Sequence, residues 1–195
     1  KKFFFASSSE VYGEGFQIPQ NEFKTPLNSR LPYAVIKNVG ESFCKTYYQE
    51  YGLKYTIFRF FNTYGPRQSK NFVMSKFIER AILNKNITIY GDGKQSRTFC
   101  YIDDTTDAIL NCLEKKIYIN DIVNIGHKKI INILNLANKI IQYSNSKSKI
   151  IHIQPLKEGD MYKRQPDITK MKILLKNKYT SLRDGIIKTI NYKIK

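Results

Sequence analysis

The sequence predicts an α/β fold with parallel strands, and three observations support this class. Short apolar runs alternate along the chain with longer segments of helical character. The apolar runs that end near residues 6 and 61 are followed directly by polar side chains, Ser7-Ser8-Ser9 and Asn62-Thr63. Of the 195 residues, 42% are hydrophobic, which is enough to build a core. In such folds the active groups lie at the carboxyl ends of strands, so these polar side chains are expected to share a cleft.

Each element is predicted by a local pattern. A strand at 2–8 is expected from Phe3-Phe4-Phe5-Ala6, and a helix at about 32–51 ends where Gly52 can act as a C-cap. The remaining expected elements are strands at 55–61, 87–90, about 98–101, 121–125 and 149–153, and helices at about 70–84, 104–114, 132–144, 167–176 and 181–192.

Tyr33 and Lys37 form the most informative pair in the chain. At a spacing of i, i+4 on a helix, the phenol and the ammonium lie on one face and can reach a shared ligand. A phenol with its ordinary pKa of about 10 is a poor base at neutral pH, unless a neighbouring positive charge favours the phenolate. Lys37 can supply that charge. The alternative is an ordinary amphipathic helix that carries both residues without a chemical role.

Charge and cysteine content exclude some classes of protein. The net charge of +17 suits nucleic-acid binding, but the lysines are spread along the chain without a basic stripe, so no nucleic-acid partner is expected. Cys44, Cys100 and Cys112 show no paired spacing, which favours a reducing, cytoplasmic compartment. His127 and His152 are isolated, so no metal site is expected. The apolar runs are much shorter than the ~20 residues that span a bilayer, so no membrane partner is expected.

Five blocks of sequence carry a resemblance to a known family. They are residues 5–13, 32–37 with Gly40-Glu41, 59–67, 89–104 and 164–168. Together they resemble the extended short-chain dehydrogenase/reductase family, which includes NAD-dependent nucleotide-sugar epimerases, dehydratases and UDP-glucuronate decarboxylases. The resemblance implies the C-terminal part of a doubly wound parallel-sheet (Rossmann) domain plus a small α/β substrate-binding domain. It assigns residues 1–66 to the NAD-binding domain and 67–195 mainly to the substrate region, with 98–125 returning to the first sheet.

One motif that the resemblance leads us to expect before residue 1 is missing from this sequence. Family members open with a glycine-rich turn that seats the NAD pyrophosphate, but no Gly-x-x-Gly-x-x-Gly or Gly-x-Gly-x-x-Gly occurs here. We therefore expect a fragment that lacks the N-terminal half of the Rossmann domain, whether that half belongs to the same polypeptide or to a separate chain. The strand at 2–8 should then have one unpaired edge, and the isolated chain should aggregate or need a partner.

The resemblance implies roles for four residues near the cofactor. Ser8 matches the Ser or Thr that hydrogen-bonds the sugar O4, and Tyr33 matches the base that takes the O4 proton. Lys37 matches the lysine that binds the nicotinamide ribose, and Thr63 is expected near the nicotinamide. The implied chemistry is oxidation of C4 by NAD to a 4-keto sugar.

Glu10 bears on the fate of that 4-keto sugar. Its place resembles a Glu that assists at C5 in dehydratases and decarboxylases, although many epimerases carry it too. Ser9 stands where deoxythymidine-linked glucose dehydratases have an Asp, which disfavours that dehydratase. Decarboxylases usually carry Asp-Gly-Arg where this chain has Lys70-Asn71-Phe72. We therefore favour 4-epimerisation, with UDP-glucuronate decarboxylation and sugar 4,6-dehydration as alternatives, and an inactive remnant or binding module as the alternative of another class.

The resemblance also implies how the substrate is bound. Arg97 and Arg164 match the arginines that face the diphosphate, and Asn62 matches a substrate-binding Asn. Tyr90 is expected to pack on the base. Asp103 and Asp104 are expected to cap the following helix. A homodimer through the helix that carries Tyr33 is also expected.

Overall fold

The computed structural model describes residues 1–14, 17–155, 163–176 and 178–194. Its helices are η1 (Ser9–Tyr12, a 3-10 turn), α1 (Pro32–Tyr51), α2 (Val73–Ile82), α3 (Ile102–Glu114), α4 (Ile133–Tyr143), α5 (Thr169–Leu174) and α6 (Leu182–Ile194). Its strands are β1 (Lys2–Ser8), β2 (Lys54–Phe60), β3 (Thr63–Tyr64), β4 (Ile87–Tyr90), β5 (Ser96–Thr98), β6 (Cys100–Tyr101), β7 (Asp121–Ile125), β8 (Ile130–Asn132) and β9 (Ile150–Ile153). The fold is α/β with parallel strands, as predicted.

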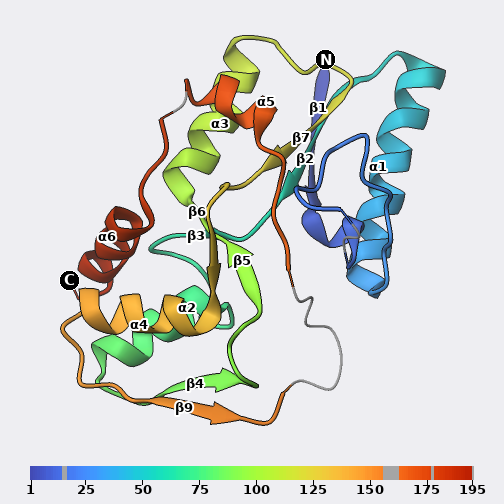
Figure 1. Ribbon diagram of the computed structural model, residues 1–195. Coiled ribbons are helices and arrows are strands. Elements are labelled where there is room, and N and C mark those ends of the chain that lie inside the picture. The colour runs from blue at the N-terminus through green and yellow to red at the C-terminus, as the bar shows by residue number, and fades with distance from the viewer. Residues whose placement is uncertain (15–16, 156–162, 177, 195) are drawn as a thin grey trace.

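A parallel sheet of three strands forms one half of the molecule. Its order is β1-β2-β7, with helices on both faces as buried parallel strands require (Figure 1). On one face, α1 packs against β1 at Gly40, where an added Cβ would lie 2.2 Å from the Phe5 ring. On the other face, α3 and α5 pack against β2 and β7 around Phe58, Val123 and Met171. This sheet fixes where the carboxyl ends of β1 and β2 meet.

The first strand lies at an edge of this sheet. Among the described residues, β1 pairs with β2 and with no other strand. Phe3 on β1 is 47% exposed, which is high for a large apolar side chain of a parallel sheet. Within the described residues, β1 is thus an edge strand.

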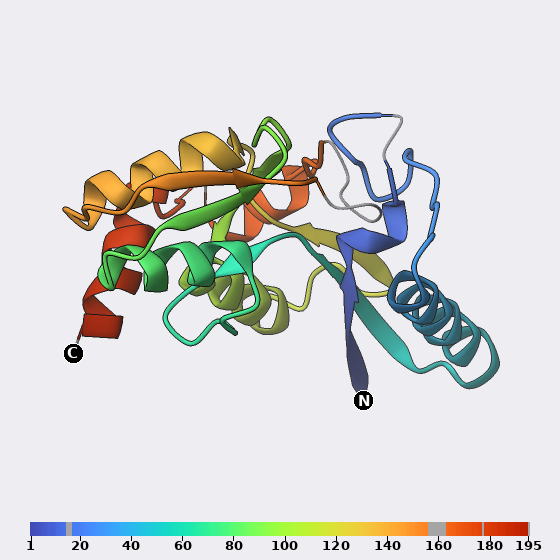
Figure 2. The ribbon, with the colours of Figure 1, turned by 90° about the horizontal axis from the view of Figure 1, so that it is seen from below.

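The other half of the molecule has its own hydrophobic core. The helices α2, α4 and α6, which supply most of it, lie together in this half (Figure 2). The paired strands β4–β9 and β5–β8 lie against these helices. The short pair β3–β6 connects the two halves, because β3 directly follows β2 and β6 directly precedes α3. The division of the chain at residue 66 stays a prediction.

Several boundaries differ from the expected ones. The predicted strand at 98–101 is two strands, because β5 pairs with β8 whereas β6 pairs with β3. The strands β3 and β8 were not predicted, since two or three residues carry no periodicity. Helix α2 covers 73–82 rather than 70–84. No helix in the described part of the chain is both long and apolar enough to cross a membrane.

The expected capping role of Asp103 and Asp104 is wrong. Helix α3 begins at Ile102, so both aspartates lie within its first turn, and no side chain caps it. The Asp104 carboxylate instead accepts hydrogen bonds from the Thr180 backbone N–H at 2.9 Å and from the Thr180 hydroxyl at 2.7 Å. Asp104 therefore anchors the segment before α6.

Gly13 provides a test of the turn that follows β1. Its φ is +60°, and an added Cβ would lie 2.0 Å from the Asn28 carbonyl oxygen. Gly13→Ala is expected to lower the free energy of unfolding by about 2–5 kcal/mol, from left-handed strain plus overlap with backbone. Gly52→Ala is the control, because Gly52 has φ +65° but open space around the added Cβ, so only about 1–2 kcal/mol should be lost. Urea unfolding of both variants measures the difference, and equal losses would contradict the close approach of Asn28.

Candidate active site

Tyr33 and Lys37 lie on one face of α1, next to the end of β1. Tyr33, the second residue of α1, is 54% exposed. The Lys37 ammonium lies 5.6 Å from the centre of the Tyr33 ring and donates a hydrogen bond of 2.8 Å to the Ala6 carbonyl. Ala6 precedes the serines by one residue. The ammonium thus connects the helix to the strand end, and the predicted pairing of phenol and ammonium is present.

Ser8 and Asn62 emerge from neighbouring strands at the same edge of the sheet. Ser8 lies opposite Phe60 in the parallel register, and Asn62 follows two residues after Phe60. Ser8 is 8% exposed, and its Oγ accepts a hydrogen bond of 3.2 Å from the Glu10 backbone N–H. The Asn62 amide donates to the Thr98 carbonyl at 3.3 Å. The shared edge is the one predicted from the sequence.

Glu10 and Arg164 form an ion pair above this edge. An Arg164 guanidinium nitrogen lies 2.8 Å from the Glu10 carboxylate and donates to the Ser9 hydroxyl at 3.2 Å. Arg164 is 6% exposed, although it is distant from Glu10 in sequence. Its neighbour Lys163 forms a parallel bridge with Ser96 of β5, so this segment contacts β5 as well as the residues that follow β1. The role of Arg164 toward a diphosphate stays a prediction.

Asn62, Tyr90 and Arg97 line one cavity of about 210 Å³. The sequence predicted these three as substrate contacts, and the structure brings them together. Other residues of the wall were not predicted: Asn71, Val73, Lys76, Phe77, Thr88, Ile89, Gln95 and Ile133. The signal for part of this set is helical spacing, because 73, 76 and 77 lie on one face of α2.

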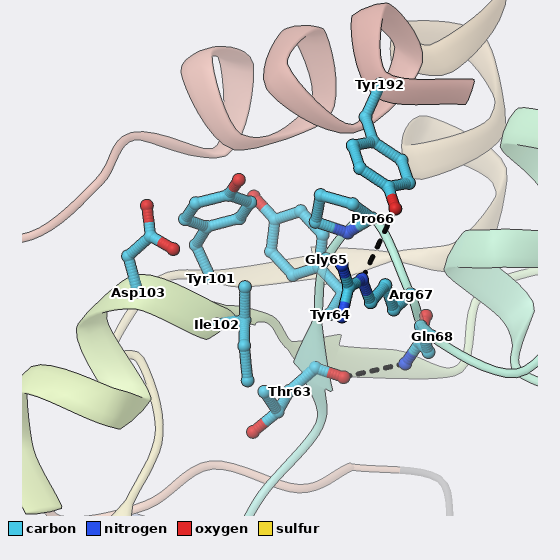
Figure 3. A pocket seen from close by; sticks show the side chains of 10 residues that line it. All are labelled: Thr63, Tyr64, Gly65, Pro66, Arg67, Gln68, Tyr101, Ile102, Asp103 and Tyr192. Carbon is cyan, nitrogen blue, oxygen red and sulfur yellow. Dashed lines mark hydrogen bonds between the residues drawn. The ribbon is translucent and has the colours of Figure 1, made fainter. Parts of the chain in front are cut away.

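Thr63 lines a different cavity, of about 420 Å³, which Figure 3 shows. There the Gln68 amide donates to the Thr63 carbonyl at 2.6 Å, and Arg67 donates to the Tyr192 hydroxyl at 3.3 Å. The Thr63 hydroxyl lies 3.4 Å from that of Thr105. The expected contact of Thr63 with a nicotinamide stays a prediction.

A buried ion pair holds the helix of Tyr33 against the sheet. Arg59 of β2 and Glu41 of α1 are 2% and 1% exposed, and two guanidinium nitrogens donate to the Glu41 carboxylate at 2.6 and 2.9 Å. The Ser7 hydroxyl donates to the same carboxylate at 2.5 Å. Because Glu41 is one turn after Lys37 and Ser7 adjoins Ser8, this pair fixes the position of α1 relative to the end of β1.

Tyr12 extends this network to η1, which carries Glu10. Its hydroxyl accepts from Arg59 at 2.9 Å and donates to the Asn124 side chain at 2.8 Å. Burial raises the pKa of Tyr12 to about 12 against the opposing influence of Arg59, so the phenol keeps the proton that it donates. Sequence reasoning missed this network. The one signal for this network in the sequence is Arg59, which lies inside an apolar strand. A buried arginine of this kind requires a carboxylate partner.

The parallel sheet with helices on both faces, and a Tyr-x-x-x-Lys helix at its carboxyl edge, define an α/β protein of the Rossmann-like class. Residues 1–126 match the NAD dependent epimerase/dehydratase family. The chain belongs to this family.

Three similar proteins show the range of this family. The chain is 38% identical to an uncharacterized UDP-glucose epimerase of Bacillus subtilis, over 97% of this chain and 60% of the relative. It is 34% identical to a UDP-N-acetyl-alpha-D-glucosaminuronate decarboxylase of Bacillus cytotoxicus, over 98% of this chain and 63% of the relative. Its structure matches UDP-glucuronic acid 4-epimerase from Bacillus cereus, in complex with UDP-glucuronic acid and NAD, with a TM-score of 0.88 and 32% identity, over 98% of this chain and 61% of that one. The chain thus spans about 60% of the length of these relatives.

Proposed function

We propose that the complete protein is an NAD-dependent enzyme that oxidises C4 of a nucleotide sugar and acts as a 4-epimerase. The observation that carries this proposal is the Lys37 ammonium, placed between the Tyr33 ring and the Ala6 carbonyl beside Ser8. A phenol next to an ammonium, at the carboxyl end of a strand, is suited to take a proton from a sugar hydroxyl. The similar epimerases of Bacillus support the same function.

In this mechanism, side chains of this protein transfer a proton and position the group that carries it. Tyr33 takes the proton of the sugar O4 hydroxyl, and Ser8 holds that hydroxyl by a hydrogen bond. Lys37, the neighbouring cation, binds the nicotinamide ribose. NAD, when bound, would supply the hydride acceptor and donor for C4. The half-exposed Tyr33 and the anchored Lys37 fit the ribose end of this cofactor.

The pyrophosphate of NAD needs a seat that these 195 residues do not supply, because they contain no glycine-rich turn. We propose that a further Rossmann half provides it, either in the same polypeptide or as a separate chain. The unpaired edge of β1 supports this proposal. A cytoplasmic setting is also proposed, since Cys44, Cys100 and Cys112 are all buried and free.

The cavity of Asn62, Tyr90 and Arg97 is proposed to hold the nucleotide. Arg97 faces the diphosphate, and Tyr90, 38% exposed, packs on the base. Arg97→Ala is expected to raise KM for the nucleotide sugar about 10–100-fold with little change in kcat, as for the loss of a charged hydrogen bond. Arg67→Ala is the control, because it removes the same charge from the other cavity. Steady-state kinetics on the NAD-loaded protein measure both, and an unchanged KM in Arg97→Ala would show that Arg97 does not contact substrate.

Decarboxylation of a UDP-uronic acid is the second candidate function. The nearly buried Arg164, paired with Glu10 near the strand end, carries guanidinium donors of the kind that bind a carboxylate such as that at C6. The similar decarboxylase of Bacillus cytotoxicus supports this candidate. Incubation with UDP-glucuronic acid separates the two, because decarboxylation releases carbon dioxide and leaves a UDP-pentose, whereas epimerisation keeps the carboxylate.

A homodimer through α1 is the third proposal. The exposed apolar side chains of α1 are Tyr33, Val35, Ile36, Val39, Phe43, Tyr47, Tyr48 and Tyr51. Such a concentration on one helix is typical of an interface between proteins. Ile36→Glu/Phe43→Glu should convert the complete protein from dimer to monomer in sedimentation equilibrium, since these side chains are 69% and 60% exposed. A wild-type protein that is monomeric at micromolar concentration would refute the interface.

A further inference from the structure

We propose that a second cavity, separate from the nucleotide-sugar site, binds a nucleoside diphosphate. The cavity has a volume of about 690 Å³ and lies between β8, α4 and the start of α6. Its wall is formed by Lys94, Ser96, Phe99, His127, Lys129, Ile130, Ile131, Asn132, Asn135, Lys139, Tyr143, Ser181, Leu182 and Arg183. None of these residues lines the cavity of Asn62 and Arg97. The helices α4 and α6 that frame it lie against each other at the far end from α1 (Figure 1).

The rim of this cavity carries an excess of positive charge. Lys94, Lys129, Lys139 and Arg183 belong to its wall, and no Asp or Glu does so in the described part of the chain. Of these four cations, Lys94 alone has an ion-pair partner among the described residues, Asp92 at 3.2 Å. These four cations come from separate segments and repel each other around one cavity. A polyanion bound between them relieves that repulsion. The diphosphate supplies such a charge.

The floor of the cavity is apolar. Phe99 is 6% exposed, and Ile131 and Leu182 pack partly buried against the core of α2, α4 and α6. Ile130, 37% exposed, adds an apolar side chain near the rim. A volume of about 690 Å³ is in the range of cavities that hold drug-sized molecules, whereas a bare phosphate would fill little of it. The ligand therefore needs a flat or apolar part, which the nucleoside provides.

His127 supplies a polar contact between the charged rim and the apolar floor. It is 8% exposed, and its Nδ1 accepts a hydrogen bond of 3.0 Å from the Lys129 backbone N–H. Burial lowers the pKa of His127, aided by Lys128 and Lys129 and opposed by Asp104, so the ring is neutral at pH 7. With Nδ1 as acceptor, the proton of the neutral ring is on Nε2. A neutral donor of this kind suits a ribose or base oxygen.

Binding of ADP to the complete protein tests the proposal. Isothermal titration calorimetry is done on NAD-loaded protein in the Arg97→Ala background, with free NAD removed, so that the cofactor site is filled and the cavity of Arg97 binds nucleotide weakly. UDP is left out, because a nucleoside diphosphate would compete for the proposed site. We expect one ADP per chain. Lys129→Gln/Lys139→Gln/Arg183→Gln should weaken ADP binding at least tenfold. The control variant Lys54→Gln/Lys115→Gln/Lys147→Gln removes the same charge from exposed positions outside the cavity and should change affinity less than twofold.

A third variant tests the apolar floor. Ile130→Ser changes no charge and removes apolar area at a partly exposed position, so it should weaken ADP several-fold and leave binding of inorganic pyrophosphate unchanged. Thermal unfolding confirms that each variant is folded. Three results would overturn the proposal: no ADP binding to the NAD-loaded protein, equal weakening in the two triple variants, or binding of pyrophosphate without ADP. None of these outcomes depends on whether the enzyme is an epimerase.

Discussion

Tyr33→Phe is expected to lower kcat at least ~100-fold and to leave KM nearly unchanged. A general base contributes about 10²–10⁴-fold to a rate, and phenylalanine cannot take the O4 proton. The free energy of unfolding of the variant should differ from that of the wild type by less than about 0.5 kcal/mol, because Tyr33 is 54% exposed and the aromatic ring is retained. Turnover of the NAD-loaded complete protein, together with urea unfolding, measures both effects.

The control for this variant is Tyr51→Phe. Tyr51 lies at the end of the same helix and is 75% exposed, so it shares the helix but not the strand end. Its turnover should equal that of the wild type. If Tyr33→Phe also retained near-normal turnover, Tyr33 would have no part in proton transfer and the mechanism would fail.

Arg59→Met is expected to lower the free energy of unfolding by about 3–5 kcal/mol. The substitution leaves the Glu41 carboxylate, 1% exposed, without the two hydrogen bonds that compensate its burial. It also removes the hydrogen bond from Arg59 to the Tyr12 hydroxyl. Urea unfolding with a constant m-value gives this loss directly.

The double variant Arg59→Met/Glu41→Met separates charge burial from packing. With both charges removed, no unpaired ion remains in the interior, so the double variant should be more stable than either single variant. A loss equal to the sum of the two single losses would show that the pair contributes no coupling. Turnover of the folded double variant then reports how strongly the position of α1 depends on this pair.

The parts of the fold with strong local signals could be predicted from the sequence. The apolar run before the serines predicted β1, and Gly52 with φ +65° ends α1 as expected. The Tyr33 and Lys37 pairing needs only helical geometry, and the shared edge of Ser8 and Asn62 needs only parallel strands. Local pattern was therefore sufficient for the centre of the site.

Features that depend on distant partners could not be predicted. The three-residue strand β8 exists because β5 pairs with it. The Asp104 carboxylate accepts hydrogen bonds from Thr180 instead of capping its own helix. Glu41 gave no sign that it would bind Arg59, and nothing near Arg164 in sequence indicates Glu10. These contacts are set by how the helices and strands pack, which a single sequence does not display.

The most direct test is to identify the nucleotide product of the complete protein. NAD-loaded wild-type protein is incubated with UDP-glucose and with UDP-glucuronic acid, and the nucleotide sugars are separated and identified by NMR. The predicted result is a C4 epimer of at least one of them, absent with Tyr33→Phe. Recovery of both sugars unchanged at C4, with neither a 4-keto sugar nor a pentose formed, would contradict an acid-base site built on Tyr33 and Lys37.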